Sequence, residues 1–333
     1  MKNHISLLFI CFVSTGVFAQ LFETEEPLCI TLDFDYTYVV KDRGERPTPY
    51  PAVMTYQTAS GEEEQIKLKI RTRGHSRKLS NVCDFPPLMF HFDDDAVENT
   101  VFHEQRKLKL VTHCRNGRRF QEMNYKEYLA YRMYNELTDR SFRVRRVEIT
   151  YRDFRGKDKI TRDGFLIEED KQLRKRLDLK KVDADERDEY SSEEVHLAKI
   201  ALFNYMIGNT DWSAREVHNL ELFREKGNEK TLVYVPYDFD WSGLVNAPYA
   251  TPQTVFGIRS VTERAYPLEC FSEASLETAL QEMRSQKAAI DRMVNRTHPV
   301  KNKESNRMKQ FYQTFWQEAD RADFISNFRR SCD

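Results

Sequence analysis

The pattern that most constrains the fold is a strict alternation of apolar and basic residues in the segment 65–73. Side chains on a β-strand point to opposite faces in turn, so the pattern predicts a half-buried strand. Similar patterns predict four further strands, at 88–92, 107–111, 142–151 and 160–167. In the third of these four the alternation slips at Arg145 and Arg146, which predicts a β-bulge.

Helical periodicity is typical of the second half of the chain. Nearly every residue from Val195 to Ile207 is apolar, which predicts a buried helix, and the preceding run Ser191–Glu194 fits a capping box. Short strands are expected at 220–223 and 231–236. Two amphipathic helices then close the chain, with apolar stripes at Leu276, Leu280, Met283, Ile290 and Val294, and at Met308, Phe311, Tyr312, Phe315, Trp316 and Ala319.

One helix is also expected among the strands, with Asn124 as its N-cap and Glu127 as an acidic third residue. These elements together predict an α+β fold of two lobes. A strand-rich amino-terminal lobe would span 27–168 and a mainly helical carboxy-terminal lobe 191–333, joined by a charged connector over 169–190. A chain of 333 residues with 40% apolar residues is large enough for both lobes.

The first residues are typical of an export signal. Lys2 precedes an apolar run from Ile5 to Val13, and small residues then predict cleavage after Ala19. This run is too short to span a membrane and no later stretch is long enough, so no transmembrane segment is expected. The mature protein, from residue 20 on, is expected to be periplasmic or secreted.

Charge and cysteine content narrow the function classes further. Lys and Arg number 52 against 53 Asp and Glu, and this balance gives no indication of nucleic-acid binding. The five cysteines after residue 19 include no C-x-x-C, which disfavours a zinc ribbon or a redox motif. One or two disulfides are expected, with Cys83–Cys114 as one pair.

Two polar segments directly follow buried elements in the second half. The first begins after Ile207 and contains Asp211, and the second contains Asp238 and Asp240. If 238–240 is extended, its two carboxylates point to one side, about 7 Å apart. Carboxylate and amide oxygens suit Mg²⁺ or Mn²⁺.

The order aspartate, asparagine, strand, aspartate is the order that phosphoryl transfer uses. The first aspartate orients the attacking hydroxyl, while the asparagine and the later aspartate hold metal ions. The alternative is that these aspartates cap turns and accept hydrogen bonds from backbone amides.

Four segments between Gln65 and Gly243 resemble, in order, those of the CotH-type kinases, a family with an atypical protein-kinase-like fold. They are similar to its R-G-x-S stretch, the end of its G-x-Y-x-x-x-E strand, its catalytic loop and its P-W-D-x-D metal segment. In this chain they are Arg71–Arg77, Gly164–Glu168, Asn209–Trp212 with Asn219, and Pro236–Asp240.

The resemblance implies a metal-dependent phosphotransferase that uses ATP or another nucleotide, Mg²⁺ or Mn²⁺, and a protein or small hydroxyl acceptor. Asp211 would be the catalytic base. The implied metal ligands are Asn219, Asp238 and, as a third candidate, Asp240. The implied nucleotide-binding residues are Glu168 at the hinge near the base, and Arg73 and Ser76 near the phosphates.

The chain departs from the family pattern where a lysine is expected, because the segment 85–91 reads Phe-Pro-Pro-Leu-Met-Phe-His. Lys107 or Lys109 on the next strand would have to replace it, and their spacing does not choose between them. Without such a cation the chain would be a catalytically inactive, kinase-like binding module of the cell envelope. A metal-dependent phosphohydrolase, in which Asp211 positions water, is the other alternative.

Overall fold

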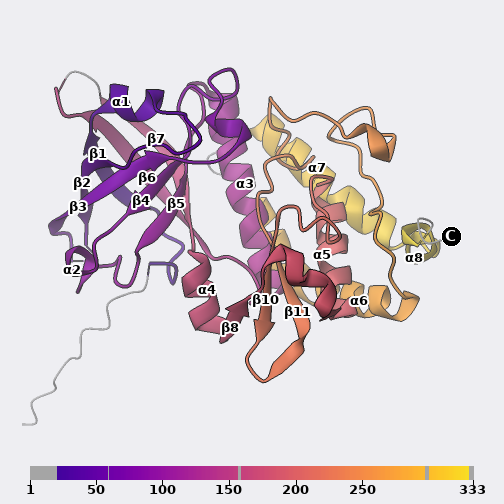
Figure 1. Ribbon diagram of the computed structural model, residues 1–333. Helices are drawn as coiled ribbons and strands as arrows, with labels where there is room; N and C mark the ends of the chain where they lie inside the picture. Colours follow the sequence, from indigo (N-terminus) through magenta and orange to yellow (C-terminus); the bar gives the residue numbers. More distant parts are fainter. Residues whose placement is uncertain (1–20, 59, 157–158, 297–299, 330–333) are drawn as a thin grey trace, which may run out of the picture.

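The computed structural model describes residues 21–58, 60–156, 159–296 and 300–329. The predicted signal peptide lies outside these ranges. Figure 1 shows a strand-rich lobe beside a mainly helical lobe, with the long helix α3 (Arg118–Leu137) at the junction. In the described ranges, none of the helices is long and apolar enough to cross a bilayer.

The strand-rich lobe is a closed barrel with the strand order β1-β2-β3-β4-β5-β7-β6. A parallel pairing of β1 with β6 closes it, and the other pairs are antiparallel. This closed seven-stranded barrel is not clearly the form of a typical kinase amino-terminal lobe. The strands are β1 (Leu28–Phe34), β2 (Tyr50–Gln57), β3 (Glu63–Thr72), β4 (Leu88–His91), β5 (Lys107–Val111), β6 (Val144–Asp153) and β7 (Lys159–Ile167).

The alternation in 65–73 is confirmed, because Ile66, Leu68 and Ile70 of β3 are buried in the barrel core. The predicted bulge in β6 is wrong. Its register with β7 runs without a shift from Val144 to Arg152. Arg145 interrupts the apolar pattern because its buried guanidinium donates to backbone carbonyls of the segment 21–26.

The helix α3 begins after Gly117, earlier than the sequence pattern predicts. Asn124 is therefore not an N-cap. It is buried within the helix, and its Nδ2 donates to the carbonyls of Val111 and Thr112 at 3.2 and 3.0 Å. Glu127, predicted as a capping residue, lies on the buried side of the same helix.

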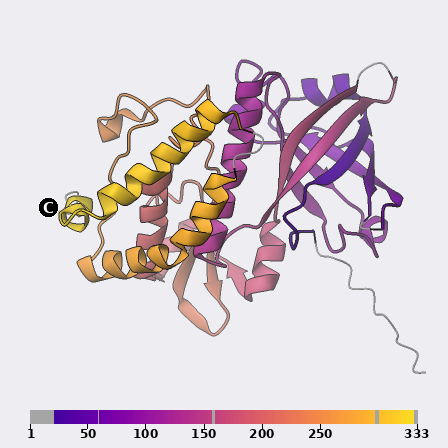
Figure 2. The same ribbon diagram turned by 180° about the vertical axis from the view of Figure 1, so that it is seen from behind.

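The helical lobe contains a second sheet with the order β8-β10-β11-β9 and the buried helix α5. The helices α6 and α7 pass across its back (Figure 2), and their predicted apolar stripes are mostly buried. The elements of this lobe are α4 (Asp170–Leu177), β8 (Leu179–Lys181), β9 (Ser191–Ser192), α5 (Glu194–Ile207), β10 (Leu220–Glu225), β11 (Asn228–Pro236), α6 (Glu273–Asn295), α7 (Asn302–Ala319) and α8 (Phe324–Phe328). Two short helices, α1 (Tyr36–Lys41) and α2 (Asp94–Val97), belong to the barrel lobe.

The predicted capping box at 191–194 is wrong. Ser191 and Ser192 form β9, which pairs with β11. The Glu194 carboxylate instead accepts from the backbone N–H of Ser272 at 2.6 Å and from the Ser275 hydroxyl at 2.8 Å. It therefore stabilises the start of α6, a helix far along the chain.

Candidate functional site

The loop after α5 brings two of the predicted site residues into contact. The helix α5 ends at Ile207, and the C-cap residue Gly208, with a positive φ of 64°, turns the chain toward Asp211. The Nδ2 of Asn219 donates to the carboxylate oxygen Oδ2 of Asp211 at 3.0 Å and to its carbonyl at 2.7 Å. The other carboxylate oxygen of Asp211, Oδ1, lies 3.1 Å from Nε2 of His218 and accepts from Gln253 at 3.0 Å.

The hairpin of β10 and β11 brings the second polar segment next to Asn219. The Asn219 carbonyl accepts from the Tyr237 N–H at 3.1 Å, and Asp238 is the next residue. The N–H of Asp238 donates to the hydroxyl of Tyr131 on α3 at 2.8 Å. The site thus combines residues from the loop after α5, the end of β11 and α3.

The extended geometry predicted for 238–240 is wrong. The strand β11 ends at Pro236, and Asp238 has a positive φ of 63°. Asp238 is exposed, whereas Asp240 is buried. Asp240 accepts from the Tyr249 hydroxyl at 2.7 Å.

A buried ionic network interacts electrostatically with Asp238. The Arg77 guanidinium contacts Glu127 of α3 at 3.0 Å and lies 3.8 Å from Asp240. All three side chains are almost fully buried. We call the set Arg77, Glu127, Asp240 and Tyr249 the buried network.

This network has more negative than positive charge. Burial and the neighbouring charge of Asp238 raise the pKa of Asp240 well above its ordinary value. Burial also raises the pKa of Glu127 to about 7, although Arg77 acts in the opposite direction. A cation bound near Asp238 would oppose both shifts.

Two cations, Lys109 and Arg73, interact electrostatically with Asp238. The Lys109 ammonium is 5.5 Å from the ring centre of Tyr237 and 5.9 Å from that of Phe142. Burial and the nearby Arg73 lower the pKa of Lys109, while Asp238 is among the charges that raise it. Burial lowers the pKa of Arg73, and the charge of Asp238 opposes this.

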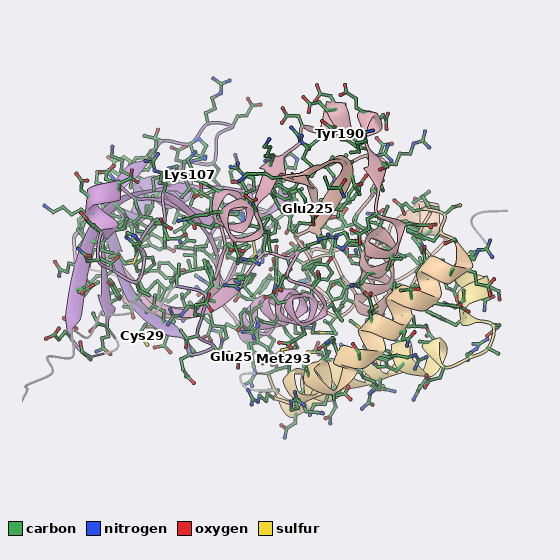
Figure 3. The ribbon with its side chains drawn as sticks, turned by 90° about the horizontal axis from the view of Figure 1, so that it is seen from below. Glu25, Cys29, Lys107, Tyr190, Glu225 and Met293 are labelled. Atoms are coloured by element: carbon green, nitrogen blue, oxygen red, sulfur yellow. A yellow bond between two sulfur atoms is a disulfide. The ribbon has the colours of Figure 1, made fainter. Side chains whose placement is uncertain are left out.

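Arg73 has a free donor, because its enclosed Nε has no hydrogen-bond partner among the described residues. Lys107, the other lysine candidate, lies on the same face of β5 as Lys109 but is exposed at the start of the strand (Figure 3), whereas Lys109 is half-buried. The charges of Arg73 and Asp238 both act on half-buried Lys109, which favours it over exposed Lys107 as the candidate phosphate-binding cation.

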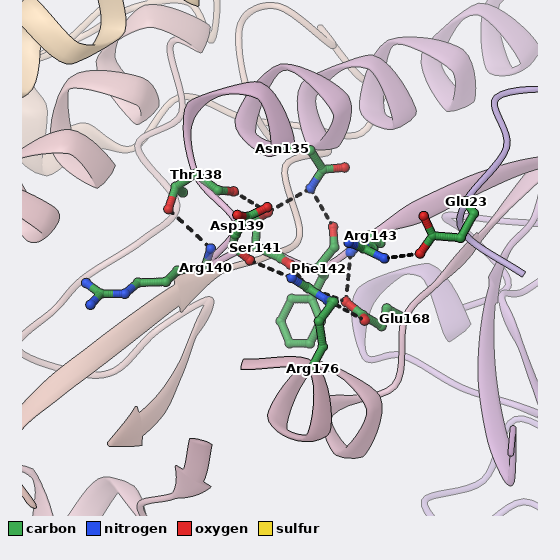
Figure 4. A network of polar contacts seen from close by, with 10 residues as sticks. All are labelled: Glu23, Asn135, Thr138, Asp139, Arg140, Ser141, Phe142, Arg143, Glu168 and Arg176. Atoms are coloured by element: carbon green, nitrogen blue, oxygen red, sulfur yellow. Dashed lines mark hydrogen bonds and ion pairs between the residues drawn. The ribbon is translucent and has the colours of Figure 1, made fainter. Parts of the chain in front are cut away.

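Ser76 and Glu168 lie outside this group of charges. Ser76 begins a 3-10 turn (Ser76–Lys78) in the loop that carries Arg77. Glu168 follows β7 and is buried, with its carboxylate accepting from the Arg143 N–H at 3.1 Å and pairing with Arg176 at 2.9 Å (Figure 4). Its carboxylate therefore joins the barrel to the start of the helical lobe.

The described residues supply at most part of a metal site. Within the described residues, no group of three or more His, Cys, Asp or Glu side chains is arranged to hold a metal alone. Mg²⁺ commonly binds one or two carboxylates and completes its shell with phosphate and water. Exposed Asp238 and the amide oxygen of neighbouring Asn219 supply such a partial set.

Several residues of the site were not recognised from the sequence as functional, among them Arg77, Glu127 and Tyr249. The available signal for Glu127 was its place between the apolar residues Tyr125 and Tyr128 of α3, where a buried carboxylate requires a partner. No local pattern indicated that this partner is Arg77, fifty residues earlier.

No protein-family model matches the chain, and a search of curated proteins found no match. Among solved structures, the chain is similar to a Helicobacter pylori proinflammatory kinase, CtkA, with a TM-score of 0.42 and 9% sequence identity. The matched region covers 78% of this chain and 94% of that one.

Proposed function

We propose that the chain is an exported, metal-dependent phosphotransferase that moves a nucleotide phosphate to a hydroxyl group of a protein or another acceptor. The observation that carries this proposal is the position of Asn219. Its side chain contacts Asp211, and its carbonyl accepts a hydrogen bond from the residue before Asp238. These two contacts support a site in which the candidate base lies near the candidate metal ligands.

Asp211 would orient the acceptor hydroxyl and accept its proton as the new bond to phosphorus forms. Its carboxylate has about four acceptor positions, and three side-chain contacts, from Asn219, His218 and Gln253, hold it in one orientation. One position is left for the hydroxyl. This geometry suits a base that must be aimed before the reaction begins.

Arg73 and Lys109 would bind the phosphate oxygens. Both lie near Asp238, and the buried Nε of Arg73 has an unused donor. Asn219 and Asp238 would hold the metal, which neutralises phosphate charge when it is bound. Asp240 is engaged with Tyr249 and Arg77, so we assign it a supporting role in the buried network.

Export is part of the proposal. The apolar run before Ala19 is typical of a signal peptide. The Cys83–Cys114 disulfide adds support, because disulfides persist mainly outside the cytoplasm.

The test is incubation of the mature chain, residues 20–333, with Mg²⁺ and ATP labelled on the γ-phosphate. The chain itself and a serine-rich test peptide serve as acceptors. We expect label on an acceptor, and we expect Asp211→Asn to lower the rate by about 10²–10⁴-fold. The control variant Asp320→Asn, at an exposed ion pair, should retain the rate.

The other outcomes identify the alternatives. Free labelled phosphate without labelled acceptor would indicate a phosphohydrolase. Neither product, with no nucleotide bound, would refute a phosphotransferase and favour a binding module.

A further inference from the structure

The Cys83–Cys114 disulfide lies at the centre of a small hydrophobic cluster of its own. Both cysteines are almost fully buried, at 0% and 1% exposure. We call this set the disulfide cluster: Cys83, Cys114, Met123, Val245 and Ala247, with Val82, Phe120, Tyr249 and Ala250 packed against it. It is separate from the core of the barrel and from the core of the helical lobe.

Three segments that carry site residues meet in the disulfide cluster. The loop with Arg73 and Arg77 leads to Cys83. Cys114 lies between β5, which carries Lys109, and α3, which carries Glu127. The third segment, 245–250, follows Asp240 and supplies Tyr249.

Besides the Arg77–Glu127 pair, hydrogen bonds near the disulfide join the first two of these segments. The N–H of Phe85 donates to the Cys114 carbonyl at 2.8 Å, and the Thr112 hydroxyl donates to the Phe85 carbonyl at 3.1 Å. The half-buried Arg115 donates to the Val82 carbonyl at 2.8 Å. These bonds keep the ends of the strands together, but none of them reaches the segment 245–250, which contacts the cluster through apolar side chains.

We propose that the Cys83–Cys114 disulfide fastens the loop 73–83, which carries Arg73 and Arg77, and the rest of the buried network together, so that the site is ordered only in the oxidised protein. Without the bond the two sulfurs must separate to van der Waals contact, which disturbs the close packing of the buried cluster. Arg77 then loses its fixed position between Glu127 and Asp240. The identity of the ligand as a nucleotide phosphate rests on the function proposed above. The effect of the disulfide on the order of these segments does not depend on that function.

The bond forms by thiol–disulfide exchange with an oxidised donor disulfide. The two thiols of the chain lose two protons and two electrons, and the donor leaves as two thiols. Because both sulfurs are buried, a reductant does not reach them in the folded protein. The disulfide therefore acts once, during maturation in an oxidising compartment, and not as a reversible surface switch.

Hydrogen exchange measured by mass spectrometry tests the fastening on the mature chain. The variant is Cys83→Val with Cys114→Ala, which keeps apolar volume and avoids a branched side chain at the positive φ of Cys114. The control is Cys29→Ala, which removes an exposed cysteine outside the disulfide. We expect exchange to rise at least about tenfold in 73–83 and 245–250, and to be unchanged in β6 and α6.

An equal rise in every element, or no rise in the two segments, would overturn the proposal. Failure of the variant to fold would also overturn it, because the bond would then support the whole chain and not the site.

Titration with ATP and Mg²⁺ is the second arm. We expect the disulfide variant to bind at least about tenfold more weakly than both wild type and Cys29→Ala. Equal binding by all three proteins would overturn the link to the site. If the wild-type protein itself does not bind ATP, the proposed function is refuted. The hydrogen-exchange result then still decides whether the disulfide orders the segments 73–83 and 245–250.

Discussion

Replacement of Arg77 should destabilise the protein much more than replacement of its partner Glu127. Arg77 is the cation that contacts both Glu127, at 3.0 Å, and Asp240, at 3.8 Å. Arg77→Met would leave two buried carboxylates without this cation. Breaking a buried pair in this way costs about 3–5 kcal/mol.

Glu127→Gln should cost less, about 1–2 kcal/mol. The pKa of Glu127 is already raised to about 7, so its carboxyl is easily neutralised, and Arg77 keeps Asp240 as a partner. Because the two residues share one contact, the double variant should cost less than the sum of the single variants, by about 1–3 kcal/mol.

The assay is urea unfolding at pH 8 without metal, followed by circular dichroism and tryptophan fluorescence. The matched control is Arg118→Met. Arg118 lies on α3, the helix that carries Glu127, and forms a half-exposed pair with Glu122, so its replacement should cost about 0.5 kcal/mol or less. The reasoning is refuted if Arg77→Met costs no more than Glu127→Gln, or if the two single variants are additive.

Three further predictions concern other parts of the chain. Burial lowers the pKa of His196 to about 4, and the hydrogen bond of its ring to the Tyr234 carbonyl only partly opposes this. Its stabilising contribution is therefore present above the unfolded pKa of about 6.5 and is lost, by about 3 kcal/mol, as the pH falls to 4. His196→Gln should flatten the dependence of the urea midpoint on pH in this window, and an unchanged dependence would contradict the assignment. Gly208→Ala should lower the melting temperature and the free energy of unfolding, the latter by about 1–3 kcal/mol. The cause is the φ of 64° at this position and the new Cβ, which would lie 2.7 Å from Cζ of Phe311. An unchanged melting temperature would show that α5 does not need this turn. Arg145→Met should speed cleavage of the segment 21–26 by a glutamate-specific protease, because two backbone carbonyls of this segment lose their buried donor. Equal cleavage rates in the variant and the wild type would show that other contacts hold the segment.

Alternation and helical periodicity predicted the elements whose faces differ in burial. The strand β3 was found close to its predicted bounds because burial alternates along it, and the helix α5 because its residues are apolar on nearly every side. The strands β1 and β2 were not predicted, and the closure of the barrel depends on the pairing of β1 with β6, which are more than one hundred residues apart. The Cys83–Cys114 pair, predicted from the sequence, is present.

The errors arose where a side chain has a distant partner. Glu194 fitted a local capping box, but its carboxylate binds Ser272 and Ser275. Asp238 fitted an extended strand, but its chain turns at that position beside Tyr131. Local patterns carry no information about such partners, so the buried network could not be predicted from spacing alone.

The most direct test of the proposed site is a crystal structure of the mature chain with Mn²⁺ and a non-hydrolysable ATP analogue, with the metal located by anomalous scattering. The account predicts a metal about 2.1 Å from the amide oxygen of Asn219 and from the carboxylate of Asp238, with the phosphates toward Arg73 and Lys109. A metal bound elsewhere, or a nucleotide whose phosphates lie away from Asp211, would contradict it.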